Sequence, residues 1–139
     1  MKLVCTVAAF VALLISSAQA EEKKDVTVTL LLSTTVTSSG QPIVLPQKNA
    51  QIIASIYEVM PGAALPEHKH PYPRYAHVLS GSLRVANTEA GQSDTYKTGD
   101  FIVESVGQWH TGANIGDEPV KLLVIDILEK GQSNTVLRE

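Results

Sequence analysis

Two histidines that lie two positions apart, His68 and His70, are the residues of this chain best placed for chemistry. Side chains alternate between the two faces of an extended strand, so these imidazoles point the same way and can bind one ion. All four histidines of the chain lie between positions 68 and 110. A His-x-His pair alone is also typical of exposed histidines, but His110 offers a third ligand from a later strand. Three neutral imidazoles can hold a divalent metal ion and leave positions open for water or a substrate.

Glycines at fixed spacing surround these histidines in two short segments. The first segment contains Gly62, His68, His70, Arg74 and Gly81, and the second contains Gly99, Ser105, Gly107, His110 and Asn114. The spacings resemble the two motifs of the cupin superfamily, G-x5-H-x-H-x3-E-x6-G and G-x5-P-x-G-x2-H-x3-N. The resemblance spans about residues 51–128 and implies an all-β double-stranded β-helix, a jelly-roll barrel that encloses a small pocket. It also implies that His68, His70 and His110 bind the metal.

The chain departs from these motifs at Arg74, which stands where the family usually has a glutamate ligand, and at Ser105, which replaces a proline. If the alternation of the strand holds, Arg74 faces the same interior as the histidines. Its guanidinium would then either bind a substrate carboxylate or form a structural ion pair, with Glu58 or Glu104 as candidate partners. The two readings remain open, and the ion pair is slightly favoured.

Gln108 and Tyr75 are the other candidate substrate-binding residues. Gln108 lies two positions before His110, so it shares a face with that histidine and could line the pocket or support the ligand by a hydrogen bond. Tyr75 follows the first histidine pair, and its hydroxyl could line the mouth of the pocket or simply pack. By the same alternation, His77 is expected on the outer face.

The rest of the chain reads as short strands separated by glycine and proline turns, which favours an all-β sandwich or barrel. The boundaries we expect are a signal peptide over residues 1–20, N-terminal strands over 21–50, the barrel core over 51–130 and a C-terminal tail over 131–139. The expected strands cover residues 26–30, 34–39, 43–45, 51–60, 74–79, 83–86, 95–97, 101–104, 109–114 and 120–128.

The first twenty residues have the features of a secretory signal peptide. A basic start at Lys2 precedes an apolar run over residues 3–15, and Ala18-Gln19-Ala20 supplies a cleavage site. We therefore expect a periplasmic or secreted protein, cleaved after Ala20, and no membrane span in the mature chain. Mass spectrometry of the exported protein checks this cleavage, and an intact Met1 on a soluble cytoplasmic form would rule it out. The single cysteine, Cys5, lies in the removed segment, so no thiolate is available to the metal site.

Charge and apolar patterning indicate the partners. Cleavage of the expected signal peptide removes Lys2 and leaves ten basic and fourteen acidic residues. The chain has no basic run, so nucleic acid is not an expected partner. The segment 120–128 is apolar on both faces of a strand, with Leu122 and Val124 on one and Leu123, Ile125 and Ile127 on the other. A barrel interior needs only one apolar face, so we expect the second to be covered in a homodimer, with the N-terminal strand as the alternative cover.

The residues and the resemblance together define two candidate functions. In the first, one divalent transition metal acts on a small, anionic organic substrate, because a three-histidine site without the glutamate is similar to those of thiol and diketone dioxygenases of the superfamily. In the second, the chain is a non-catalytic cupin that binds a metal or another small ligand. We expect iron or manganese, with zinc, nickel and copper as alternatives, because an all-imidazole site discriminates poorly among metals.

Overall fold

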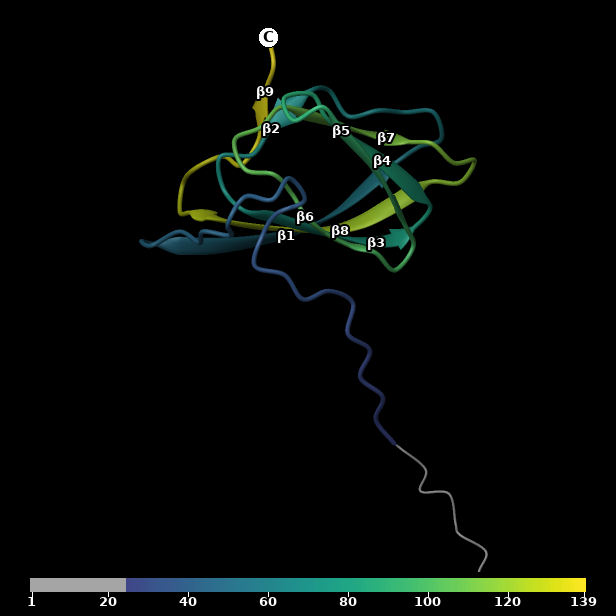
Figure 1. Cartoon of the computed structure of the whole chain (residues 1–139), viewed down its shortest axis with the longest axis horizontal. Helices are drawn as coiled ribbons and strands as arrows, with labels where there is room; N and C mark the ends of the chain where they lie inside the picture. Colours follow the sequence, from purple (N-terminus) through teal and green to yellow (C-terminus); the bar gives the residue numbers. More distant parts are fainter. Residues whose placement is uncertain (1–24) are drawn as a thin grey trace, which may run out of the picture.

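The computed structural model describes residues 25–139, which form two facing antiparallel β-sheets (Figure 1). The expected signal peptide lies outside the described residues. One sheet has the strand order β1-β8-β3-β6 and the other β5-β4-β7-β2-β9. The strands are β1 (Ala50–Val59), β2 (His68–Lys69), β3 (Arg74–Ser80), β4 (Ser82–Asn87), β5 (Gln92–Lys97), β6 (Phe101–Val103), β7 (His110–Asn114), β8 (Val120–Glu129) and β9 (Val136–Leu137). This arrangement confirms the expected all-β jelly roll.

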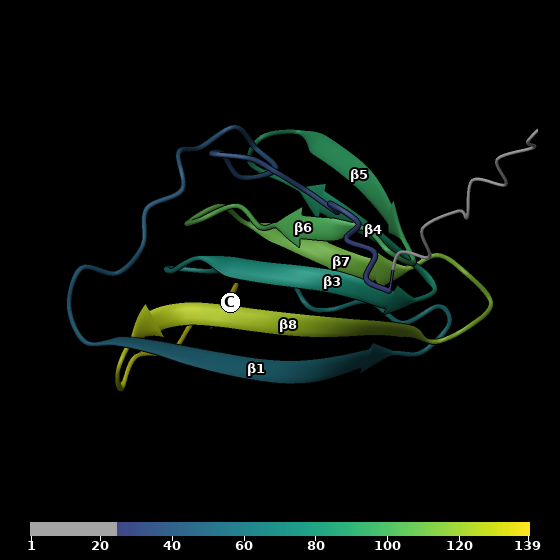
Figure 2. The same cartoon turned by 90° about the horizontal axis from the view of Figure 1, so that it is seen from below.

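Strands that are distant in the sequence lie side by side in both sheets. β8 pairs with β1 along its whole length and with β3 on its other edge, as Figure 2 shows. In the second sheet β7 lies between β4 and β2, and His68 pairs directly with His110. The barrel therefore brings the two glycine-rich segments together, although about forty residues separate their histidines.

The apolar core occupies only part of the space between the sheets. The buried cluster consists of Val59, Ala76, Val78, Leu83, Ile102, Val120, Leu122 and Val124. Along β8 the buried inward residues are first apolar, Val120, Leu122 and Val124, and the next one is the charged Asp126. On the neighbouring strand β3, Arg74 pairs with Asp126. The inner side chains of neighbouring strands meet in register, so this change of polarity separates an apolar core from a polar site.

The N-terminal segment differs from the expectation. Residues 26–30, 34–39 and 43–45 form no strand in the described part of the chain, where an isolated bridge between Val36 and Pro42 is the regular pairing before β1. Val28 and Leu30 are 88% and 77% exposed. The alternating pattern of residues 26–30 is suited to a strand, but a strand needs a neighbour for its backbone groups, and residues 26–30 have no backbone hydrogen bond within the described chain. Ser38 anchors the following loop by donating its backbone N–H to the carbonyl of Val103 on β6.

The C-terminal segment is likewise more than a tail. Residues 131–139 turn back toward the site, where β9 pairs with β2 and Asn134 is buried. Residues 25–139 contain no helix that is long and apolar enough to cross a membrane.

The outer face of the first sheet is apolar, and its part on β1 is exposed. Leu123, Ile125 and Ile127 point away from the core, and the register places Ile56 beside Leu123 and Ile52 beside Ile127. Ile52 and Ile56 are 68% and 61% exposed. The N-terminal segment reaches only the β6 side of this sheet, where Leu31, Leu32 and Ile43 lie near Tyr75 and Phe101. We propose that a second copy of the chain covers the remainder.

Substitution Ile56→Glu should convert a dimer into a monomer, because it places a charge in the middle of the proposed interface, while the exposed side chain supports no core packing in the single chain. Light scattering at micromolar concentration measures the mass. The control is Val28→Glu, the same change at a more exposed apolar residue in the N-terminal segment, which should remain a dimer. A wild-type mass of one chain would contradict the proposal.

Candidate metal centre

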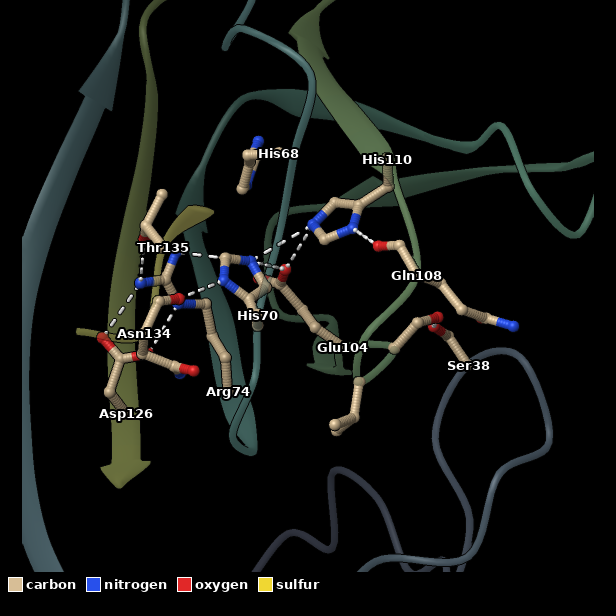
Figure 3. A network of polar contacts seen from close by, with 12 residues as sticks. Ser38, His68, His70, Arg74, Glu104, Gln108, His110, Asp126, Asn134 and Thr135 are labelled. Atoms are coloured by element: carbon tan, nitrogen blue, oxygen red, sulfur yellow. Dashed lines mark hydrogen bonds and ion pairs between the residues drawn. The ribbon is translucent and has the colours of Figure 1, made fainter. Parts of the chain in front are cut away.

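Three histidines from two parts of the chain meet inside the barrel (Figure 3). His68 lies on β2, His70 follows that strand, and His110 begins β7. Their side chains are buried, with residue exposures of 5%, 0% and 3%, and their ring centroids lie 4.5–4.8 Å apart. His68 and His70 share a face because the backbone is extended here, and antiparallel pairing of β2 with β7 adds His110 to the same face.

Each ring is oriented by a hydrogen bond to a backbone carbonyl. His68 Nδ1 lies 2.7 Å from the carbonyl oxygen of Pro66, His70 Nδ1 lies 2.6 Å from that of Asn134, and His110 Nδ1 lies 2.9 Å from that of Gln108. A carbonyl can only accept, so Nδ1 carries the proton in all three rings. In the neutral imidazole Nε2 is then the atom with a free lone pair, and this arrangement is typical of histidines that bind metal.

The protonation of His68 suits a ligand. Burial lowers the pKa of His68 to about 4, although its hydrogen bond to Pro66 acts in the opposite direction. The neighbouring His110 and His70 lower it further. His68 is therefore neutral at pH 7, and neutral imidazole is the form that binds a metal ion.

Glu104 is the site residue that we did not predict as part of the histidine cluster. It follows β6, and its Oε2 atom lies 3.1 Å from His70 Nε2 and 3.3 Å from His110 Nε2. Burial acts to raise the pKa of this carboxyl, but the hydrogen bonds with His110 and His70 hold it well below its usual range. The same contact raises the pKa of His110 against the effect of burial. Alternation along residues 101–104 places Glu104 on the same inward face as Ile102, so the sequence does contain a signal for Glu104.

Arg74 faces the interior, as its position four residues after His70 predicts, and it is only 5% exposed. Its Nε donates to Asp126 Oδ1 at 2.7 Å and its Nη2 donates to Asp126 Oδ2 at 3.0 Å, which is the bidentate geometry that guanidinium favours with a carboxylate. This is a structural ion pair, but with Asp126 and not with Glu58 or Glu104. The Asp126 carboxylate also contributes to the raised pKa of Arg74, against the effect of burial. Because Asp126 occupies two of the donors, only Nη1 remains directed to the site, 3.4 Å from His70 Nε2.

Asn134, in the C-terminal segment, completes this network. Its side-chain amide donates to Asp126 Oδ1 at 2.6 Å, its side-chain oxygen accepts from the backbone N–H of Tyr72, and its backbone carbonyl orients His70. No motif in the sequence points to Asn134, because its role depends on a chain reversal after β8 that has no spacing signature.

The remaining two predicted site residues have other positions. Gln108 supports His110 through its backbone carbonyl, while its side-chain oxygen accepts from Asn87 Nδ2 at 2.8 Å. Tyr75 lies on the outer face of β3, where its ring is 6.4 Å from that of Phe101. The structure does not bring Tyr75 to the histidines, because it neighbours the inward Arg74 on a regular strand and must point the other way.

Two small cavities flank His110 and Glu104. One, of about 10 Å³, is lined in part by Ser38, Asn87 and Asp94, and the other, of about 20 Å³, by apolar residues that include Leu65 and Leu122. A cavity of this size holds about one water-sized molecule. The interior thus has room for an ion and a small ligand atom, and a larger organic molecule requires movement of the walls.

The chain belongs to the cupin family, because a cupin domain is matched over residues 55–126, more than half of the chain. Gentisate 1,2 dioxygenase 1 of Aquipseudomonas alcaligenes is 25% identical over 76 residues, which are 55% of this chain and 22% of that protein. A structure of Bacillus subtilis oxalate decarboxylase, studied for its Mn(II) centers, is 26% identical with a TM-score of 0.51, over 62% of this chain and 23% of that one. The chain therefore spans less than a quarter of the length of these two proteins.

A third structure, of a protein close to this chain in length, shows similarity of fold only. The polyketide cyclase of Streptomyces resistomycificus is 19% identical, with a TM-score of 0.54 and coverage of 70% of both chains. The three histidine Nε2 atoms in the cupin barrel form a donor set that fits a divalent transition metal, since imidazole binds most ions of that series.

Removal of the carboxylate at position 126 should destabilise the protein strongly. Asp126→Ala leaves the Arg74 charge buried without its partner, which costs about 3–5 kcal/mol. Urea denaturation with a chelator present measures the loss independently of metal. The control Glu58→Ala breaks a surface pair, in which Lys121 Nζ lies 3.7 Å from Glu58 and both side chains are half exposed, so it should cost no more than about 1 kcal/mol. Equal losses would show that the Arg74 ion pair does not stabilise the barrel.

Proposed function

We propose that this protein binds one divalent transition metal ion through His68, His70 and His110 and acts on a small organic substrate in the manner of cupin dioxygenases. The observation that carries the proposal is the convergence of three buried imidazoles, each with Nδ1 bonded to a backbone carbonyl and Nε2 as its remaining nitrogen. In His70 and His110 this Nε2 atom faces Glu104 Oε2. The ion we expect is iron or manganese, with zinc, nickel and copper as alternatives. The similarity to an oxalate decarboxylase with Mn(II) centers and to a gentisate dioxygenase supports this choice.

The residues of the site have three different roles: metal binding, charge and an apolar lining. The three histidines would hold the ion, which when bound polarises a ligand oxygen or activates O₂. Arg74 Nη1 presents a cation next to His70, which favours an anionic group at the site, although Asp126 compensates most of that charge. The apolar wall formed by Leu65, Leu83 and Leu122 excludes water from one side of the site.

A specific observation also favours a second candidate, a metal-binding cupin without catalysis. The cavities beside His110 are of the size of single water molecules, so an organic substrate does not fit the barrel as it stands. Such a protein would keep its metal enclosed and exchange it slowly. For either candidate we place the protein in the periplasm or outside the cell, on the basis of the cleavage site after Ala20.

The purified mature protein should contain one metal ion per chain, and His68→Ala should lower its metal occupancy at least about tenfold, because the ion loses one of three ligands. Elemental analysis after dialysis measures this. The control is His77→Ala, since His77 lies on the outer face of β3 and its Nδ1 contacts the carbonyl of Asp100. An equal loss in both variants, or a wild-type protein without metal, would contradict the proposed site.

Oxygen consumption separates the two candidates. The iron-loaded protein is tested with gentisate as the probe, and His68→Ala serves as the control. Consumption by the wild type alone supports the enzyme. Tightly held metal without consumption, over a wider set of small carboxylates and thiols, supports the non-catalytic binder.

A further inference from the structure

We infer that Glu104 is a fourth metal ligand, supplied from the segment after β6 in place of the carboxylate that position 74 lacks. This inference rests on the proposed metal site and assigns to it a residue at a position that the second glycine-rich motif leaves unspecified, between Gly99 and Ser105. Three observations carry it: the spacing of the donor atoms, the charge of the site and the position of Arg74.

The donor atoms have the spacing of ligands around one ion. Glu104 Oε2 lies 3.1 Å from His70 Nε2 and 3.3 Å from His110 Nε2, and these two nitrogens lie 3.2 Å apart. Ligands bound at about 2.0–2.2 Å to a common ion lie about 3.0 Å apart at right angles and about 3.4 Å apart at the tetrahedral angle. The three atoms therefore form a nearly equilateral triangle with the edges of one face of a coordination shell. His68 offers its donor atom within 4.8 Å of the other two histidines.

Among the described residues, the Glu104 carboxylate contacts the histidines and has no lysine or arginine in a salt bridge with it. Arg74 and Asp126 neutralise each other through two hydrogen bonds, and the histidines are neutral when they act as ligands. Glu104 remains, with its side chain only 15% exposed. A buried carboxylate is costly unless it is paired or coordinates a metal. A divalent ion at the histidine nitrogens supplies that partner.

Arg74 explains why the ligand comes from another strand. The guanidinium at position 74 is held by Asp126 and directs Nη1 to within 3.4 Å of His70 Nε2, on the side where a glutamate at this position would lie. Glu104 approaches the same nitrogen from β6, the strand next to β3, at 3.1 Å. Positions 74 and 104 thus both face His70, and in this chain the carboxylate is at position 104.

The competing arrangement is an internal ion pair, in which a protonated histidine bonds to Glu104 and opposes metal binding. The two arrangements predict opposite effects of Glu104→Gln, a substitution that keeps the shape of the side chain and removes its charge. A ligand role weakens metal binding in the variant. A competing ion pair leaves the affinity unchanged or increases it.

The test is calorimetric titration of the metal-free protein with Mn²⁺, and in parallel with Zn²⁺. Glu104→Gln should raise the dissociation constant at least about tenfold, the lower end of the loss caused by removal of groups that only support a ligand. The matched control is Glu58→Gln, the same change on the exposed side of β1, with no expected effect. Infrared difference spectra, with and without metal, add a readout that a purely structural role does not change. The wild type should show a shifted glutamate carboxylate band that Glu104→Gln lacks.

The outcomes are distinct. Weaker binding in Glu104→Gln together with the carboxylate shift supports the inference. Unchanged or tighter binding, or no carboxylate shift in the wild type, overturns it and leaves the three-histidine site intact. Absence of Mn²⁺ and Zn²⁺ binding by the wild type overturns the proposed metal site and this inference together. If the variant does not fold, the absence of a carboxylate shift in the wild type still overturns the inference.

Discussion

The ion pair between Arg74 and Asp126 holds the histidine site in place from the side of the first sheet. The two residues face each other on β3 and β8, and both are nearly excluded from water. Asp126 also accepts from Asn134, and the backbone carbonyl of Asn134 fixes the ring of His70. One buried carboxylate therefore connects two central strands, the C-terminal segment and a ligand histidine. A buried charge pair rarely adds net stability compared with apolar residues, but it specifies one arrangement, because each partner is costly when left alone.

The polar site and the apolar core depend on the same strands. β8 contributes Val120, Leu122 and Val124 to the core and then Asp126 to the site, and β3 changes from Arg74 to Ala76 and Val78 in the same way. The core fixes the register, because a shift by one residue would turn every inward side chain outward. Register in turn fixes the distance between the charged groups and the histidines. The site can therefore be rigid although it contains few apolar contacts of its own.

The sequence predicts most of the strands and the three histidines, but it does not predict the partner of Arg74 or the role of Asn134. Alternation and glycine spacing are local signals. They identify β1, β3, β4, β6, β7 and β8, the second half of β5, and the convergence of His68, His70 and His110. The partner of Arg74 could not be found in this way, because Asp126 lies 52 residues away and the pairing of β3 with β8 is a property of the fold. Asn134 was missed for the same reason. The expected N-terminal strands are absent from the described residues for a different reason. Residues 26–30 have the pattern of a strand, but no strand edge of the described chain pairs with them.

The charges of the side chains at positions 74, 104 and 126 depend on one another. The usual cupin motif has a glutamate at position 74. The single replacement of Arg74 by glutamate would place three carboxylates, at 74, 104 and 126, in one buried network and remove the cation that pairs with Asp126 in the described structure. Like charges in a buried site raise each other's pKa and cost stability, so the usual ligand set cannot be restored by that change alone. Loss of the carboxylates at 104 and 126 in the same protein would return the site to a single negative charge. The departure from the motif at Arg74 is thus explained by two other residues, and the charge offered to a metal ion is the same in both arrangements.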